Sequence, residues 1–216
     1  MNEGLLAALA AAAVTVGSLH TLAPDHWVPF AALSRARGWS TRRTLSVTLL
    51  CGFGHVTVSA LLGLAGLLLG LRMMEAFGRR METAAGFLLV AFGIAYGLWG
   101  LRRAAGRRLH GHSHSRYDHI HDSERVTAWT LFLLFSADPC VAVIPLLFAA
   151  APLGGLPTAG IVVLYELSTL GAMVALVLAA RFGARRFHAG WLDLHADAAA
   201  GAVIAAVGLA VIGLGW

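Results

Sequence analysis

Residues 82–100 read ETAAGFLLVAFGIAYGLWG, an apolar stretch close to the roughly 20 residues that a helix needs to cross a bilayer. Residues 197–215 read DAAAGAVIAAVGLAVIGLG and repeat its main features. In both stretches a glycine follows the acidic residue after four positions and a second glycine follows after seven more, at a constant separation of 115 residues along the chain. The recurrence predicts two related membrane-spanning helices, one in each half of the chain.

The overall composition is that of an integral membrane protein. Of the 216 residues, 58% are hydrophobic and 12% are charged, whereas a soluble domain carries about 25% charged residues. The net charge of +5 could suit nucleic acid, but the sixteen basic residues are all arginines in short clusters between apolar runs. Such clusters usually encode membrane topology. We therefore expect the lipid bilayer as a partner and no nucleic acid.

Six apolar segments are each near or above the length that crosses a bilayer. We expect spans at residues 4–34, 44–71, 82–101, 126–150, 157–181 and 196–215. No basic segment precedes the first apolar run, so we expect a first span rather than a cleaved signal peptide. This segment is too long for one straight helix, and Pro24 and Pro29 predict a kink or break within it.

The first two spans also have counterparts in the second half. APDHWVP, which contains Pro24, aligns with ADPCVAVIP, which contains Pro139, at the same separation of 115 residues. GHVTVSALLGLAG, which contains His55, aligns with YELSTLGAMVALV, which contains Glu166, at a separation of 111 residues. Each half therefore has three spans, and an odd number makes the second half enter the membrane in the opposite sense.

These alignments predict an all-α integral membrane protein built as two inverted three-helix repeats, residues 1–101 and 126–216, with the first and fourth spans kinked or broken at proline. Residues 102–125 between them are polar and rich in histidine, which predicts a mobile loop. Thirteen arginines lie in the connections after the first, third and fifth spans, and three lie elsewhere. By the positive-inside rule we expect a multi-pass protein of the inner or plasma membrane, with both termini outside and the histidine-rich loop in the cytoplasm.

The most informative motif is HTLAPDHW, residues 20–27, because it puts three ionisable side chains at membrane depth. A carboxylate at the bilayer centre costs about 2.5 kcal/mol or more unless it is paired, hydrated or protonated. On a straight helix His20 and His26 would face different sides. Pro24 between them allows the chain to turn, so that both imidazoles address one ion.

Other ionisable residues lie in the spans that align with one another. Imidazoles combined with a few carboxylates or a thiolate suit Ni²⁺, Co²⁺, Zn²⁺ or Cu²⁺, whereas Mg²⁺ and Ca²⁺ prefer oxygen ligands. The predicted metal ligands are His20, Asp25, His26 and His55, with Asp138, Cys140 and Glu166 as further candidates.

Simpler roles stay open for several of these residues. His55 alone on an apolar helix could be hydrogen-bonded within the bundle, and Asp138 could cap a broken helix. Glu166 could carry protons rather than bind metal. Cys140 and Cys51 could be small core residues.

The predicted loop offers a second group of candidate ligands. Accessory metal binding is expected at His110, His112, His114, His119 and His121. Such tracts bind borderline transition metals weakly and flexibly. A solvated linker without a metal-binding role is the alternative.

The segment from His20 to His26 follows the H-x4-D-H signature, and GHVTVS, with His55, is similar to a second glycine–histidine motif. In these motifs the chain resembles the nickel/cobalt transporter (NiCoT) superfamily, and its six spans and histidine-rich loop look most like the efflux-type branch. Where the uptake permeases carry an acidic LGFDT-like motif, this chain has FSADPCVAVIP. That departure leaves the metal and the direction of transport open.

The resemblance implies a gradient-driven transporter of Ni²⁺ or Co²⁺, not an enzyme, with His20, Asp25, His26 and His55 as its recognition residues. We expect alternating access, with export slightly favoured and protons as the coupling ion. No cofactor is expected to be tightly bound, because the metal is cargo. A homo-oligomer is compatible with the sequence.

Two alternatives remain. One is a membrane thiol–disulfide electron carrier, since Cys140 follows Pro139, although Asp25 occupies the matching position of the first half. The other is a related transporter of a different small substrate.

Overall fold

The computed structural model describes residues 3–69, 71–109, 117–138, 140, 142–184 and 195–214. Within these ranges the regular secondary structure is helical and contains no strand, which confirms the predicted all-α class. Five helices are long and apolar enough to cross a membrane: α1 (Glu3–His20), α3 (Thr41–Leu69), α4 (Leu71–Leu109), α7 (Gly155–Ala184) and α9 (Ala196–Leu214). The chain therefore has the helices of a multi-pass membrane protein, while the number of six spans stays a prediction.

The first predicted span is interrupted at its proline, as expected. Helix α1 ends at His20, a 3-10 turn η1 spans Pro24–His26, and α2 spans Val28–Ala36. Ala23 has φ −54° and ψ 129°, an extended conformation, because the ring of Pro24 disfavours helical geometry in the residue before it. The break therefore has a local steric cause.

The predicted fourth span is also divided. Helix α5 (Tyr117–Ser136) ends before Ala137, and α6 (Val143–Ala150) follows and continues into the 3-10 turn η2 (Ala151–Leu153). Their apolar parts, Thr127–Ser136 and Val143–Leu153, are each shorter than a span. The break predicted within the fourth span is therefore present.

The predicted loop over 102–125 is helical at both ends. Helix α4 continues to Leu109 and α5 begins at Tyr117. The arginines and alanines that follow residue 101 are strong helix formers, so they extend α4 past the apolar run. His119 and His121 belong to α5, whereas His110, His112 and His114 lie outside the described residues.

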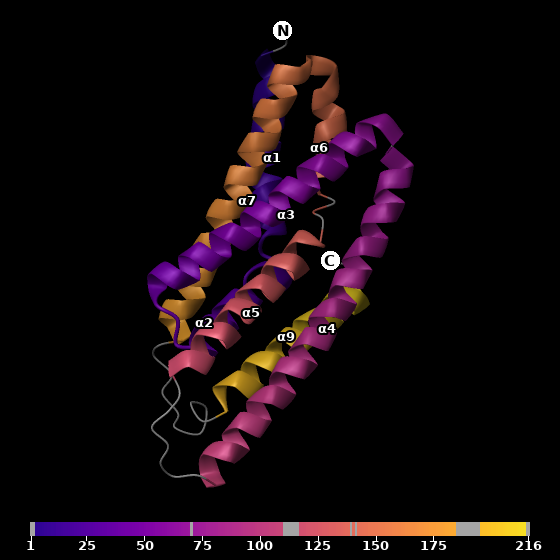
Figure 1. Cartoon of the computed structure of the whole chain (residues 1–216). Helices are drawn as coiled ribbons and strands as arrows, with labels where there is room; N and C mark the ends of the chain where they lie inside the picture. The colour runs from indigo at the N-terminus through magenta and orange to yellow at the C-terminus, as the bar shows by residue number, and fades with distance from the viewer. Residues whose placement is uncertain are drawn as a thin grey trace.

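The helices pack in pairs that are distant in sequence (Figure 1). Helices α1 and α7 lie side by side and run downward in this view, whereas α3 and α5 lie side by side and run upward. Helices α4 and α9 pack against each other in opposite directions. A Cβ atom at Gly93 would lie 2.4 Å from the backbone nitrogen of Ala205, so the α4–α9 contact requires glycine.

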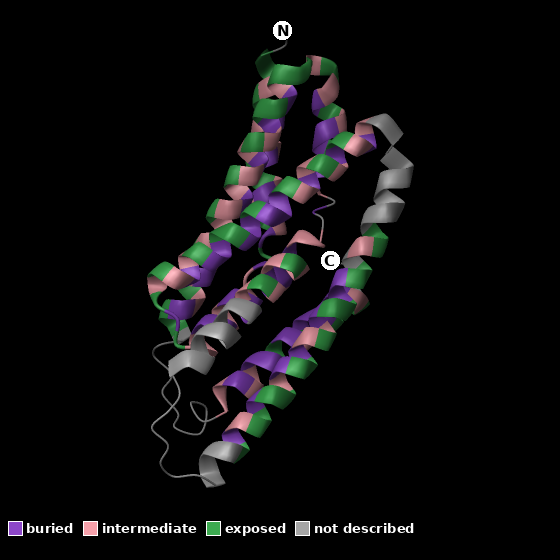
Figure 2. Cartoon of the chain, in the orientation of Figure 1, coloured by how far each residue is buried: buried purple, intermediate pink, exposed green. Residues whose placement is uncertain are grey.

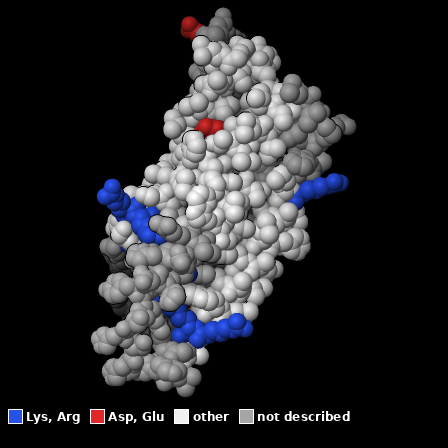
Figure 3. All heavy atoms as spheres, in the orientation of Figure 1, with Lys and Arg blue, Asp and Glu red and all other residues white. Residues whose placement is uncertain are grey.

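Burial follows these pairings (Figure 2). One core cluster includes Phe30, Leu131 and Ile204, and a second includes Leu147 and Tyr165. Many large apolar side chains point outward instead, such as Leu156 and Leu133. Figure 3 shows a broad face without charge between groups of arginine side chains. An exposed apolar surface of this kind suits contact with lipid.

A buried polar network joins α2, α4 and α9. The Arg37 guanidinium donates a hydrogen bond of 2.7 Å to the Tyr96 hydroxyl, which donates one of 2.7 Å to Asp197 Oδ1. Arg103 donates to Asp197 Oδ2 at 2.9 Å. The buried Asp197 carboxylate is thus compensated by two arginines, as a buried charge requires.

A second network fixes the end of α7. Buried Arg181 donates hydrogen bonds to the Ser34 hydroxyl of α2 and to the carbonyl of Trp39. It also donates to the Thr44 hydroxyl of α3 at 3.2 Å. The connection between α2 and α3 is therefore held against the second half of the chain.

Candidate metal centre

The break after α1 brings two histidines of the motif together. His20 is the last residue of α1 and His26 is the last residue of η1. Their ring centroids lie 4.3 Å apart, with the ring planes at 79°. The turn at Pro24 therefore brings the two imidazoles together, whereas a straight helix would point them to different sides because they are six residues apart.

Asp25 lies beside His26 rather than facing lipid. Its Oδ1 is 3.1 Å from His26 Nδ1, and both residues are buried, with 6% and 3% of their surface exposed. A carboxylate on one imidazole nitrogen fixes the orientation of the ring, as it does for metal-binding histidines in general. Asp25 therefore orients His26.

His55 approaches the same point from α3. Its ring centroid is 5.1 Å from that of His26, and its Nδ1 is 3.2 Å from the carbonyl oxygen of Phe135 on α5. A carbonyl oxygen only accepts hydrogen bonds, so Nδ1 carries the proton in this contact. Nε2 of the neutral ring then has a lone pair that can bind a metal ion.

Two of these lone pairs are buried without a hydrogen bond. Within the described part of the chain, Nε2 of His20 and Nε2 of His55 have no hydrogen-bond partner. Buried polar atoms are nearly always hydrogen-bonded, and each exception requires an explanation. A metal ion bound by both nitrogens would supply one.

Cys140 lies at the same point, in the non-helical stretch between α5 and α6. The ligand atoms of His20, His55 and Cys140 all lie within 4.8 Å of one another. The first half thus contributes two imidazoles and the second half a thiol.

Two hydrogen bonds hold Cys140. Its backbone N–H donates to the Ser59 hydroxyl at 2.7 Å, and that hydroxyl donates to the carbonyl of His55 at 2.7 Å. Its Sγ lies 2.6 Å from the hydroxyl of Tyr165 on α7. Ser59 and Tyr165 were not among the residues predicted from the sequence, although Ser59 lies one turn after His55 on α3.

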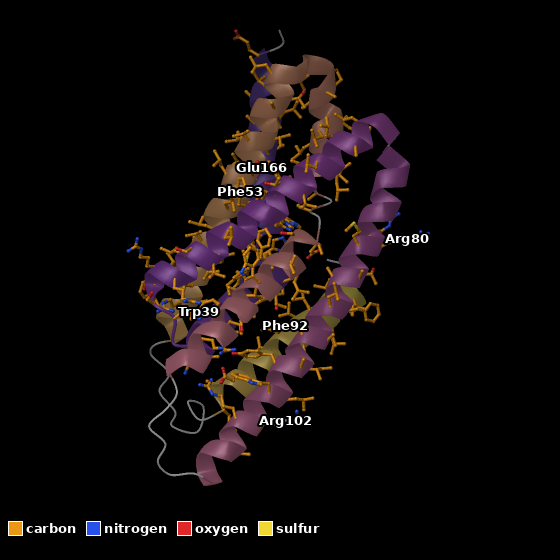
Figure 4. All side chains as sticks on the ribbon, viewed as in Figure 1. Trp39, Phe53, Arg80, Phe92, Arg102 and Glu166 are labelled. Atoms are coloured by element: carbon orange, nitrogen blue, oxygen red, sulfur yellow. The ribbon has the colours of Figure 1, made fainter. Side chains whose placement is uncertain are left out.

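Glu166 lies away from the close ligand group, and Asp138 is outside it although Cys140 lies two residues further along the chain. Glu166 lines an apolar cavity of about 450 Å³ between α3, α6 and α7, together with Leu64, Leu147 and Thr158. Figure 4 shows it on α7. Asp138 is half-buried, and the backbone N–H of Asp138 donates to the Phe135 carbonyl at 3.4 Å. Among the described residues, the close ligand group includes neither carboxylate.

The two cysteines are not joined by a disulfide. Both are free and buried. Cys51 packs in the core cluster around Phe30 and Leu131, whereas Cys140 packs in the cluster around Leu147 and Tyr165. A thiol–disulfide mechanism needs two thiols that can bond to each other, and the electron-carrier alternative stays an untested prediction.

No family model, curated protein or solved structure matches the chain. The resemblance to nickel/cobalt transporters therefore stays a prediction.

Proposed function

We propose that this protein transports a divalent transition-metal ion across a membrane, with Ni²⁺ or Co²⁺ as the expected substrate. One observation carries the proposal: the Nε2 atoms of His20 and His55 are buried and have no hydrogen-bond partner among the described residues, at a break in an apolar helix. Such a pair has little value for packing, because each buried unsatisfied polar group costs about 1–3 kcal/mol. A bound ion would offset that cost.

The side chains around this point favour a transition metal. His20, His26 and His55 supply imidazoles, and Asp25 holds the ring of His26. Imidazole ligands suit Ni²⁺, Co²⁺, Zn²⁺ and Cu²⁺, whereas Mg²⁺ and Ca²⁺ require several oxygen ligands. An inorganic anion would be repelled by the Asp25 carboxylate.

Contacts between distant helices support an inverted repeat. Gly86 contacts Gly208, and Gly93 contacts Gly201. Gly86 and Gly201 are separated by 115 residues, as are Gly93 and Gly208, so exchanging the halves turns one contact into the other. Helices α1 and α7 run in one direction and α3 and α5 run in the other, as an inverted repeat requires if α1 corresponds to α5 and α3 to α7.

The mechanism that follows is alternating access at the junction of the two halves. The close ligand group combines α1 and α3 of the first half with the α5–α6 connection of the second, and His26 of η1 lies against two of its rings. Rocking one half against the other would open this point to either side. Protons that compete with metal for imidazoles and carboxylates would provide coupling to a gradient. We propose that the histidine-rich segment 102–125 faces the cytoplasm and collects metal, which favours export.

Metal flux into proteoliposomes tests the proposal. We expect the wild-type protein to move Ni²⁺ or Co²⁺ under a proton gradient, and His20→Ala and His26→Ala each to abolish this flux. His195→Ala is the matched control, because His195 precedes α9, outside the close ligand group, and it should keep wild-type flux. Wild-type rates in the His20→Ala protein would contradict the assignment of the site.

A further inference from the structure

We infer that Cys140 is the metal ligand contributed by the second half of the chain, and that the substrate is a borderline divalent metal ion that accepts two imidazoles and one thiolate. This inference rests on the proposed function, whose recognition motif lies in the first half. It identifies Cys140, rather than Asp138 or Glu166, as the residue that completes the centre.

The distances support a three-residue site. The ligand atoms of His20, His55 and Cys140 lie within 4.8 Å of one another. Metal–nitrogen bonds of about 2.0 Å and metal–sulfur bonds of about 2.3 Å put tetrahedral ligand atoms roughly 3.5 Å apart. The three ligand atoms therefore need to approach one another by about 1 Å when an ion enters. Small rotations of the side chains within their rotamer wells can supply this movement.

His55 provides a second, independent observation. Only 2% of its surface is exposed, and its Nδ1–H is occupied by the Phe135 carbonyl. Nε2 is then the remaining polar atom of the ring, and it is one of the atoms without a hydrogen-bond partner in the described chain. The Cys140 sulfur thus lies close to two buried histidines whose Nε2 atoms have no hydrogen-bond partner in the described chain, an arrangement that a purely space-filling cysteine would not require.

Hydrogen bonds around Cys140 also fix its position relative to His55. Ser59 accepts the N–H of Cys140 and donates to the carbonyl of His55, so a single side chain sets the spacing of the two ligands. The Tyr165 hydroxyl lies 2.6 Å from Sγ and can donate a hydrogen bond to a thiolate. Tyr165 is therefore a positioning residue for the ligand.

Thiolate ligation defines the class of substrate. Coordination displaces the thiol proton to water, and the sulfur then binds the metal as a thiolate. Thiolate and imidazole together suit Co²⁺, Ni²⁺ and Zn²⁺, whereas Mn²⁺ and Mg²⁺ prefer carboxylate, carbonyl and water. Cys140 would thus disfavour the harder ions Mg²⁺ and Mn²⁺.

Co²⁺ binding to the purified full-length protein in detergent tests the inference, because a cobalt–thiolate bond has a charge-transfer absorption that imidazole and carboxylate ligands lack. Cys51→Ser is the matched control, since it leaves Cys140 as the one thiol in the chain. We expect the Cys51→Ser protein to keep the absorption and the Cys140→Ser protein to lose it. In Tyr165→Phe we expect the absorption to remain at a shifted energy, with Co²⁺ affinity roughly 10–100-fold weaker.

The outcomes separate the inference from the proposed function. If the Cys51→Ser protein binds Co²⁺ without the charge-transfer absorption, Cys140 is not a ligand, and the histidine site of the proposed function still stands. If the wild-type protein binds no Co²⁺ at all, both are wrong. Loss of the absorption in a modest excess of Mn²⁺ would overturn the assigned substrate class. Because the Cys51→Ser spectrum decides alone, the test does not depend on the folding of the Cys140→Ser protein.

Discussion

At the scale of single residues, Asp25 is the clearest case of a side chain that acts through another. Its carboxylate contacts His26 Nδ1 at 3.1 Å, and both groups are buried. We predict that Asp25→Asn weakens Co²⁺ binding roughly 10–100-fold, because an amide orients the imidazole less strongly than a carboxylate. Isothermal titration in detergent measures the change.

A matched variant keeps that result interpretable. Glu3→Gln makes the same change of charge at the start of α1, far along the helix from His20, and should leave the affinity unaltered. Equal affinities of Asp25→Asn and wild type would mean that the carboxylate does not position His26.

The motif residues were predictable from the sequence, and their immediate partners were not. Three ionisable groups around Pro24 in an apolar segment are enough to indicate a site, because side chains of this kind are costly at membrane depth. Ser59, Tyr165 and the Phe135 carbonyl act through contacts between helices that are distant in sequence. Nothing in the local pattern of α3, α5 or α7 marks such contacts.

At the scale of helices, glycine determines how closely α4 and α9 approach. A Cβ atom at Gly201 would lie 2.4 Å from the Gly97 backbone nitrogen and 2.5 Å from the Gly93 carbonyl oxygen. Backbone atoms of a helix cannot move aside without separating the pair. The repeat of glycines at 115 residues was visible in the sequence, but the contact between the two repeated helices emerged only in three dimensions.

We predict that Gly201→Ala lowers stability by about 1–3 kcal/mol, the usual cost of inserting a methyl group into a closely packed contact. For a protein of this size that corresponds to a fall in Tm of roughly 2–12 °C. Gly171→Ala on α7 is the control, since among the described residues no atom of another helix lies within 4 Å of its added Cβ. Thermal unfolding in detergent compares the two variants, and equal Tm values would rule out this packing argument.

At the scale of the whole molecule, the breaks within the spans were predicted from proline, whereas the length of α4 was not. Helix α1 ends before Pro24 and α5 ends before Pro139, as predicted for the first and fourth spans. The extension of α4 beyond residue 101 was missed, because hydropathy marks apolar sequence and the arginines that follow residue 101 are good helix formers.

The orientation in the membrane is testable on α4. Arg80 and Arg102 are exposed, lie on this one helix (Figure 4) and are 22 residues apart, which at 1.5 Å per residue is roughly the thickness of the hydrocarbon core. We predict that an impermeant maleimide labels Arg80→Cys in intact cells and labels Arg102→Cys only after permeabilisation. Cys51 and Cys140 are buried and should not react. The reverse pattern would invert the proposed topology.

The glycine contact between α4 and α9 also has a consequence for biosynthesis. The last residue of α4, Leu109, and the first residue of α9, Ala196, are 87 positions apart, which at about 5–20 residues per second takes a ribosome roughly 4–17 s. During that interval α4 has no permanent neighbour for its glycine face. A transmembrane helix inserts first and associates later, through packing with its partner. The α4–α9 contact therefore waits for the synthesis of α9, and a nascent chain halted before residue 196 would leave α4 open to pairing with another polypeptide.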